Sequence, residues 1–462
     1  MRRFAPLINK DIPVCRNPLM IGGLVMIHSC TDVKNALLNC LESMSENPWL
    51  YSNKTNQFSR QRKISFTDAV LSTISMQRSS SKTEILKYYD FLPDAPSHSA
   101  LIQQRSKLKP QAFEELFYHF TDALSPDSTL KGYRLFAVDG TDIYIPRDPK
   151  DTDTYRITDK YGKGFNMLHL NAAFDLKASL YTDIIIQPVN HINEYLALCD
   201  MIDHFSMSHP MEKALFIADR GFASFNVFAH AAENNAFFLI RAREKGPKSM
   251  LSKTDLPSDP EFDITFERWL TRRNTKTVKA QPEVFKTVAS RIFDYLEPKS
   301  QKIYYICFRI IRILLPDGSS EYLYTNLPKE DFSLSEIRDL YNLRWGIETA
   351  FRDIKYAAGM LFFHSRKKQL VLQEIYAKLI LYNFSEAITS GIAIRKKSSR
   401  FVYRINFTRA LSLCAEYLRR CRRGKPRLEL DKLLSKDLIP ERPGRSSPRF
   451  IRARTAASFQ YR

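Results

Sequence analysis

The chain has 462 residues, of which 44% are hydrophobic and 12% aromatic. This composition excludes an intrinsically disordered chain and provides enough apolar side chains for about two to four folded domains. The 70 basic and 50 acidic side chains give a net charge of +20. Such an excess predicts a polyanionic partner, because phosphate groups release counterions when Lys and Arg side chains bind them.

Positive charge is concentrated near the C-terminal end. Residues 395–462 contain 20 Lys and Arg and five acids, a net charge of +15 (20 − 5). A segment that lies on a membrane surface would show a cleaner amphipathic stripe. Nucleic-acid contact is therefore the favoured interpretation of this segment, and a solvated basic tail is the alternative.

The cysteine and histidine patterns exclude the commonest disulfide and metal motifs. The seven cysteines include no C-x-x-C pair, and the nine histidines include no H-E-x-x-H motif. The apolar run Pro18–Ile27 resembles the core of a signal peptide, but it is too short to span a membrane and no clean cleavage site follows it. We therefore expect a cytoplasmic protein with reduced cysteines and no membrane partner, which starts at Met1 or at Met26.

The first part of the chain, residues 1–128, is predicted to be a helical DNA-binding region. Apolar periodicity indicates helices over Phe66–Met76, Lys82–Phe91, Ser97–Leu108 and Gln111–Leu124. The third helix and its end carry side chains that reach bases and phosphates, namely Gln103, Gln104, Arg105, Lys107 and Lys109. A helical scaffold with a solvated polar face is the alternative.

The pattern changes to alternating strands and helices over residues 129–245. The apolar runs Tyr133–Val138 and Ala214–Ala218 predict short buried strands, which end at Asp139 and Asp219 and are followed closely by glycine. If the two strands are neighbours, the two carboxylates converge at one edge of the sheet. The alternative is two turn-forming aspartates before glycine, which are common. Further strands and helices are expected over Leu168–Phe174, Leu180–Pro188, Glu194–Phe205, Phe225–Asn234 and Ala236–Arg241.

Residues 246–332 depart from this order and are interpreted as a β-rich insertion. Lys302–Leu314 and Glu321–Tyr324 have strand-like patterns. They are joined by Pro316-Asp317-Gly318, which is a turn sequence. The strand–helix core is therefore expected to resume only after this segment.

One helix is predicted over residues 333–357, since Ser333 and Glu336 have the spacing of a capping box. Its apolar positions form a core-facing stripe. An adjacent arc of about 60° carries a phenol, a carboxylate and two cations, from Tyr341, Arg344, Glu348 and Lys355. The alternative is an ordinary amphipathic helix, in which the glutamate forms i,i+4 ion pairs with arginine.

Three acids without histidine or cysteine suit a particular chemistry. In-line attack on a phosphodiester needs an activated nucleophile and a stabilised leaving oxygen, which two Mg²⁺ ions about 3.5–4 Å apart supply. Mg²⁺ prefers hard oxygen ligands and keeps several waters, so a few carboxylates suffice. Asp139, Asp219 and Glu348 are therefore the candidate catalytic residues and metal ligands.

The arc on the last helix also carries a recognisable motif. Tyr341, Arg344, Glu348 and Lys355 complete the spacing Y-(2)-R-(3)-E-(6)-K, which resembles the signature of bacterial insertion-sequence DDE transposases of the "insertion sequence four" type. The sequences around the two aspartates, AVDGTDIYIP and FIADRGF, are similar to that family's first and second aspartate regions. The resemblance covers roughly residues 130–400.

The resemblance implies an α/β fold with an RNase H-like catalytic core, made of residues 129–245 and 333–400 on either side of the insertion. The helical region precedes this core, and a basic segment, residues 401–462, follows it. The resemblance also implies that the three acids hold two Mg²⁺ ions, for which Mn²⁺ substitutes.

Contacts to the DNA backbone near the active site are implied for the other motif residues, Tyr341, Arg344 and Lys355. Arg220, next to the second aspartate, is a further candidate phosphate contact. Relatives that cut through a DNA hairpin hold a flipped base on an aromatic side chain of the insertion. Trp269 is one of several candidates for that role, and structural packing is the alternative.

The implied activity is that of a DNA transposase. It would hydrolyse the DNA at the terminal inverted repeats of an inserted element and then join the freed 3′-hydroxyl to target DNA. By analogy, its partners are double-stranded DNA and a second copy of the chain on paired ends, in the bacterial cytoplasm and at the nucleoid. An RNase H-like nuclease without strand transfer and a domesticated DNA-binding regulator are the alternatives.

Overall fold

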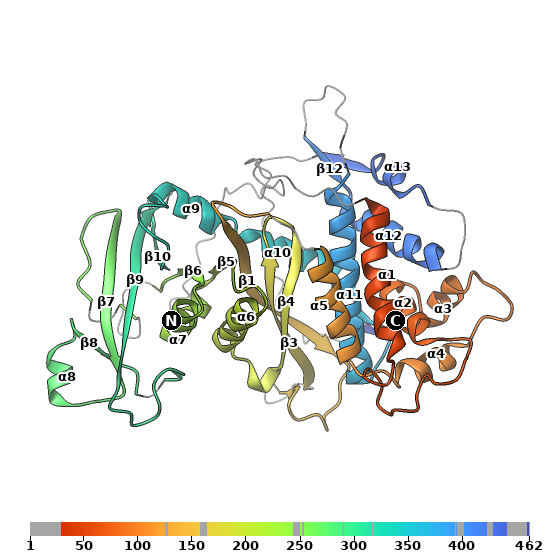
Figure 1. The fold of residues 1–462 in the computed structure, drawn as a ribbon, viewed down its shortest axis with the longest axis horizontal. Coiled ribbons are helices and arrows are strands. Elements are labelled where there is room, and N and C mark those ends of the chain that lie inside the picture. The colour runs from red at the N-terminus through yellow and green to blue at the C-terminus, as the bar shows by residue number, and fades with distance from the viewer. Residues whose placement is uncertain are drawn as a thin grey trace, which may run out of the picture.

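The computed structural model describes residues 29–124, 128–157, 164–243, 250–251, 254–289, 291–315, 318–392, 394, 402–422, 428–440 and 460–461. The expectations for Pro18–Ile27, for the start codon and for part of the basic C-terminal segment lie outside these residues. A β-rich end, a central sheet with helices on both faces, and a helical end follow one another along the long axis (Figure 1). No helix among the described residues is long and apolar enough to cross a membrane.

One large mixed sheet runs through the middle of the molecule. Among the described residues it has ten strands in the order β2-β3-β1-β5-β6-β10-β9-β7-β8, with β4 beside β3. Its centre is parallel, since β5 pairs in parallel with both β1 and β6, whereas β3 and β10 flank this centre in antiparallel pairing. The strands are β1 (Tyr133–Ile145), β2 (Tyr155–Arg156), β3 (Phe165–Asp175), β4 (Leu180–Pro188), β5 (Lys213–Ala218), β6 (Phe237–Arg241), β7 (Phe262–Thr271), β8 (Phe285–Thr287), β9 (Ile303–Leu314) and β10 (Ser320–Thr325).

Helices surround this sheet, so the expected α/β class is confirmed. The strands of the segment 246–332 extend the same sheet through the pairing of β10 with β6. The described helices and remaining short elements are α1 (Cys30–Glu46), α2 (Phe66–Ser75), α3 (Ser81–Tyr88), α4 (His98–Arg105), α5 (Gln111–Leu124), η1 (Val189–His191), α6 (Glu194–Ser208), η2 (Arg220–Phe222), α7 (Phe225–Glu233), α8 (Lys276–Ala280), α9 (Leu334–Asn342), α10 (Trp345–Arg352), η3 (Asp353–Ala357), β11 (Phe362–Phe363), α11 (Lys368–Ser390), β12 (Tyr403–Ile405), α12 (Phe407–Arg422), α13 (Leu430–Leu434), β13 (Leu438–Pro440) and β14 (Gln460–Tyr461).

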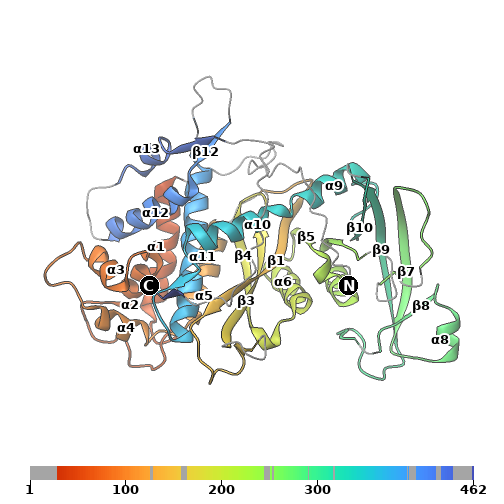
Figure 2. The ribbon, with the colours of Figure 1, turned by 180° about the vertical axis from the view of Figure 1, so that it is seen from behind.

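The two faces of the central sheet are covered by different helices. α6 and α7 lie on one face, and α9 and α10 cross the other (Figures 1 and 2). Side chains alternate along each strand, so Phe136 and Phe216 are buried against α6 and α7, whereas Leu135 and Leu215 are buried against α9. Odd-numbered residues at the ends of β1 and β5 are therefore directed to the face that α9 and α10 cover.

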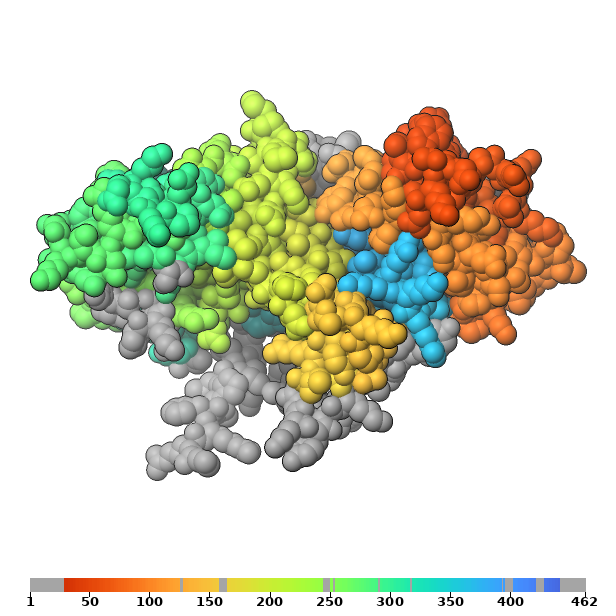
Figure 3. Space-filling view, turned by 90° about the horizontal axis from the view of Figure 1, so that it is seen from below, coloured from red at the N-terminus to blue at the C-terminus, as the bar shows by residue number. Residues whose placement is uncertain are grey.

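The helical end of the molecule is built from both halves of the sequence. α1 to α5 share one hydrophobic core with α10, α11 and α12. On the surface, the orange N-terminal helices lie directly against the light-blue C-terminal half (Figure 3). Serine side chains cap the starts of several N-terminal helices, and Ser29 and Ser65 form complete capping boxes with Asp32 and Asp68.

Two boundaries differ from the expectation. β1 does not end at Asp139, because β3 continues to pair with it as far as Ile145. The helix predicted over 333–357 is divided into α9, α10 and the π-helical turn η3. Between α9 and α10 the backbone bonds shorten to i→i+3, as in the bond from Arg344 N to Tyr341 O. Leu176 packs closely on this turn, since a Cβ at Gly346 would lie 2.8 Å from Leu176 Cδ2.

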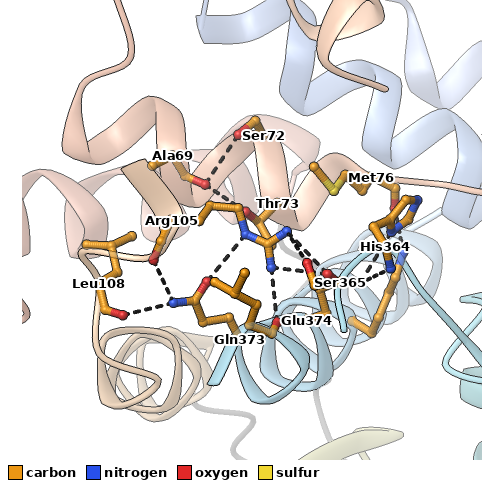
Figure 4. Close-up of polar contacts among 12 residues, drawn as sticks. Ala69, Ser72, Thr73, Met76, Arg105, Leu108, His364, Ser365, Gln373 and Glu374 are labelled. Carbon is orange, nitrogen blue, oxygen red and sulfur yellow. Dashed lines mark hydrogen bonds and ion pairs between the residues drawn. The ribbon is translucent and has the colours of Figure 1, made fainter. Parts of the chain in front are cut away.

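Arg105 was expected to contact DNA, and this expectation is wrong. The side chain is completely buried and forms an ion pair with Glu374 of α11 at 3.2 Å (Figure 4). The backbone N–H of His364 donates to the same carboxylate at 2.8 Å. Burial opposes ionisation of Glu374, but Arg105 and His364 hold its pKa at about 2, well below its ordinary value. A charged network thus joins α4 to α11 inside the helical core.

Replacing Glu374 with Gln is expected to destabilise the fold by about 3–5 kcal/mol, because Arg105 would remain buried without a counter-charge. The pKa of Glu374 is lowered from 4.5 to about 2, so its stabilising effect is complete above pH 4.5 and disappears as the pH falls towards 2. Urea unfolding at several pH values measures both effects. Gln103→Ala, on the exposed side of α4, is the control, and equal stability of Glu374→Gln and wild type at pH 7 would contradict the argument.

Candidate active site

The two predicted aspartates lie side by side at the carboxyl ends of neighbouring parallel strands. The last residue pair between β1 and β5 is Val138 with Ala218. Asp139 and Asp219 are the next residues on the two strands, and by alternation both face α9 and α10. Carboxyl ends of parallel strands are where ligands commonly bind in open α/β sheets. The expected neighbourhood of the two strands is confirmed.

α10 brings Glu348 to the same place, together with a buried arginine. Arg344 Nη1 lies 3.2 Å from Glu348 Oε1, and the arginine side chain is 7% exposed. Burial alone lowers the pKa of Arg344, but nearby acidic groups raise it above its ordinary value, namely Tyr341, Glu348, Asp219 and Asp139. The guanidinium therefore contacts Glu348 directly and interacts electrostatically with the other two predicted catalytic acids, Asp139 and Asp219.

The charge of the acids is only partly compensated. The pKa of Asp139 is raised to about 6, mainly by burial and further by the negative charges of Glu348 and Glu194, while the Gly140 N–H and Arg344 act in the opposite direction. The Gly140 N–H donates to Asp139 Oδ1 at 2.9 Å. A further cation beside such a carboxyl group would stabilise its ionised form.

The hydroxyl group of Tyr341 is a second sign that the site is prepared for a ligand. Tyr341 is 5% exposed, and its hydroxyl has no hydrogen-bond partner among the described residues. Burial also raises the pKa of this phenol, so it stays a neutral donor. The guanidinium carbon of Arg344 lies 5.8 Å from the centre of its ring. A buried donor without an acceptor is costly unless a ligand provides one.

The oxygen atoms of the three acids are ligands of the kind that a hard divalent cation prefers, although they are not arranged around one. Within the described part of the chain, no three His, Cys, Asp or Glu side chains are arranged to hold a metal ion. Oxygen-only ligands are nevertheless those that Mg²⁺ and Mn²⁺ prefer. The incompletely compensated charge around Asp139 is consistent with such a cation.

Two residues beside the aspartates were missed by the sequence argument. These residues are Glu194, the first residue of α6, and His169. Glu194 Oε1 lies 3.2 Å from His169 Nε2, and His169 Nδ1 donates to Asp142 at 2.9 Å. Burial lowers the pKa of His169, but these two acids raise it to about 9. No sequence signal distinguished Glu194, because an acid in the first turn of a helix is an ordinary stabilising feature.

The remaining predicted contacts lie on other elements of the fold. Lys355 is on the π-helical turn η3, beyond the end of α10. Arg220 borders a different cavity of about 420 Å³, together with Arg243 and Arg291. Trp269, on β7, is 39% exposed and its ring lies 5.1 Å from that of Tyr305. The electrostatic environment of Arg344 thus links Tyr341 and Arg344 to the acids, and the roles of Lys355 and Arg220 stay predictions.

Comparison with known proteins identifies the family. A family model described as "Transposase DDE domain" matches residues 130–384 of the 462. The chain belongs to the DDE transposase family. No curated protein matches it. Among solved structures it is similar to the "Cryo-EM structure of piggyBac transposase synaptic complex with hairpin DNA", with a TM-score of 0.44 and 11% identity over 90% of this chain and 86% of that chain.

Family membership confirms the transposase expectation at a general level. It implies an enzyme that cleaves nucleic acid, and DDE transposases generally use divalent metals. The matched range includes Asp139, Asp219 and Glu348. The narrower assignment of this transposase to the "insertion sequence four" type stays a prediction.

Position 140 requires glycine, because neighbouring side chains closely approach its backbone. Gly140→Ala should therefore destabilise the transposase. A Cβ there would lie 2.3 Å from His169 Nε2 and 2.8 Å from Glu194 Oε1. Because His169 is buried and held by Asp142, it has little room to move, and we expect a stability loss of about 1–3 kcal/mol from overpacking. Thermal unfolding measures this loss. Gly221→Ala is the matched control, since its Cβ would meet Glu194 only at 3.2 Å; equal stability of the two variants would contradict the argument.

Proposed function

We propose that this DDE transposase excises a DNA element and joins it to target DNA by metal-dependent phosphoryl transfer. The observation that carries the proposal is that Asp139 and Asp219 follow the paired ends of β1 and β5, and that Arg344, which pairs with Glu348, interacts electrostatically with both, within the matched range. The central strands β1, β5 and β6 with their covering helices would be an RNase H-like core. The segment 246–332 would be its insertion, as in transposases of the "insertion sequence four" type.

Each residue of the site has a role that its surroundings support. Asp139, Asp219 and Glu348 would hold two Mg²⁺ or Mn²⁺ ions, which activate the attacking oxygen and stabilise the leaving oxygen. Arg344 has donor groups beyond the one that faces Glu348, and a guanidinium binds phosphate oxygens in pairs. The unpartnered hydroxyl of Tyr341 would donate to the same phosphate. Both side chains would thus position the scissile group beside the acids.

Contacts further along the DNA are proposed for Lys355 and Arg220. Lys355 lies about two helical turns beyond Glu348 in sequence, which suits a neighbouring phosphate better than a metal. Arg220, with Arg243 and Arg291, provides three guanidinium groups around one cavity. Two transposon ends must be joined, so a homodimer on paired DNA ends is part of the proposal.

We propose that the N-terminal helices recognise DNA through a surface other than the one around Arg105. A polar cavity of about 570 Å³ lies between the segment that joins α1 to α2 and the end of α4. Its lining contains no acidic residue and includes Arg60, Arg62 and Lys107. Burial, and after it the charge of Arg62, lowers the pKa of Lys107. Amide side chains suited to base contacts border it as well, namely Asn56, Gln57, Gln61 and Gln104.

Replacing Asp139 or Asp219 with Asn, or Glu348 with Gln, should abolish cleavage and leave DNA binding nearly intact. The carboxylates hold cations, whereas affinity for DNA comes mainly from basic groups. Cleavage in Mg²⁺ and gel shifts on DNA that contains the flanking sequences of the gene measure the two effects. Glu42→Gln, on the exposed side of α1, is the control. Robust cutting by any one of the three variants would remove that residue from the site.

The same assay separates the alternatives. A nuclease would cut these ends but yield no joined product with target DNA. A regulator would bind the ends without cutting them. Strand-transfer products that depend on all three acids are the result expected of a transposase.

The double variant Arg60→Ala/Arg62→Ala should weaken binding and reduce the slope of log affinity against log salt by about two. The reason is that each guanidinium is expected to neutralise one phosphate. Binding across a salt series measures the slope. Lys276→Ala/Lys279→Ala removes two exposed charges from α8 at the other end of the molecule and is the matched control. An equal loss in both double variants would show that only net charge matters.

A further inference from the structure

The carboxylate of Glu194 lies against the backbone that follows both aspartates. A Cβ at Gly140, the residue after Asp139, would lie 2.8 Å from Glu194 Oε1. A Cβ at Gly221, two residues after Asp219, would lie 3.2 Å from Glu194 Oε2. Each oxygen of one carboxylate therefore closely approaches a different one of the two segments, and glycine at both positions leaves room for it.

The position of this carboxylate is fixed from two directions. At its base, α6 begins with an N-cap, because the Asn193 side chain accepts from Leu196 N. At its tip, Oε1 lies 3.2 Å from Nε2 of His169, whose side chain is 8% exposed. His169 stands on β3 directly opposite Asp142 of β1, which accepts from its other ring nitrogen. Glu194 is thus anchored to the same strands that carry the site.

We propose that Glu194 is a positioning residue of the active site, which acts as a spacer between the segments that follow Asp139 and Asp219. It would set the separation of the two carboxylates, and thereby their affinity for divalent cations, without touching DNA or metal itself. The inference rests on the proposed function, because it assigns cation binding to those two aspartates. It depends on the length of the side chain, since the approach involves both carboxylate oxygens.

Three substitutions distinguish the effect of the length of the Glu194 side chain from the effect of its charge. Glu194→Ala removes the spacer, Glu194→Asp shortens it by one methylene group, and Glu194→Gln keeps its length while removing its charge. Mn²⁺ titration calorimetry on the DNA-free protein gives a readout that does not need activity. The Ala and Asp variants should lose about 10–100-fold in Mn²⁺ affinity, as is usual when support of a metal ligand is removed. The Gln variant should recover most of that loss.

A matched control shows whether stability alone accounts for the change. Glu212, whose side chain is 45% exposed against 36% for Glu194, pairs with Arg134 at the opposite end of β1 and β5. Glu212→Ala should therefore cost comparable stability in thermal unfolding without changing Mn²⁺ affinity. DNA cleavage as a function of Mn²⁺ concentration should shift to higher concentrations for Glu194→Asp and not for Glu212→Ala.

The outcomes distinguish this inference from the function on which it rests. Wild-type Mn²⁺ affinity in Glu194→Asp would overturn the proposal that Glu194 acts as a spacer. A loss of affinity in Glu194→Gln as large as that in Glu194→Asp would overturn it too, because the effect would then come from the charge. If Glu194→Ala does not fold, the Asp and Gln variants still decide the question. Wild-type Mn²⁺ binding and cleavage by Asp139→Asn would overturn the proposed function instead.

Discussion

The parallel pairing of β1 with β5 is the constraint on which the arrangement of the acids depends. Both strands run in the same direction, and their pairing ends at Val138 and Ala218. Neighbouring strands lie about 4.8 Å apart, so the two following aspartates start from adjacent positions at one edge. A shift of one residue in this register would turn one aspartate to the opposite face, towards α6. Buried aromatic residues such as Phe136 and Phe216, whose rings stack at 5.4 Å, oppose such a shift.

The balance of charge around those aspartates then affects how readily they ionise. Arg344 forms an ion pair with Glu348 and interacts electrostatically with Asp139 and Asp219, and burial weakens the screening of the repulsion among these acids. Burial is the main cause of the raised pKa of Asp139, and repulsion from Glu348 and Glu194 adds to it. A divalent cation would relieve the same repulsion and release the arginine from Glu348.

Local patterns predicted much of this arrangement, and tertiary contacts account for what they missed. Apolar runs located β1 and β5 correctly, because a fully buried strand must be apolar throughout. They did not show that β3 prolongs β1 beyond Asp139, since that depends on a partner strand. They also did not show the break between α9 and α10, where Gly346 packs closely on Leu176, a residue that is distant in sequence. The burial of Arg105 depends on Glu374 in the same way, because its charge suggested an exposed residue.

The shared helical core also limits how DNA recognition can be assigned to one part of the chain. α11 is buried along most of its length, and α2 and α5 cover it together with α12. Removing residues 1–128 would expose that apolar surface and leave Glu374 without Arg105, at a cost that exceeds the usual net stability of a domain. Loss of DNA binding after such a deletion would therefore report unfolding. Only substitutions on the surface, such as those at Arg60 and Arg62, leave this core intact and test recognition itself.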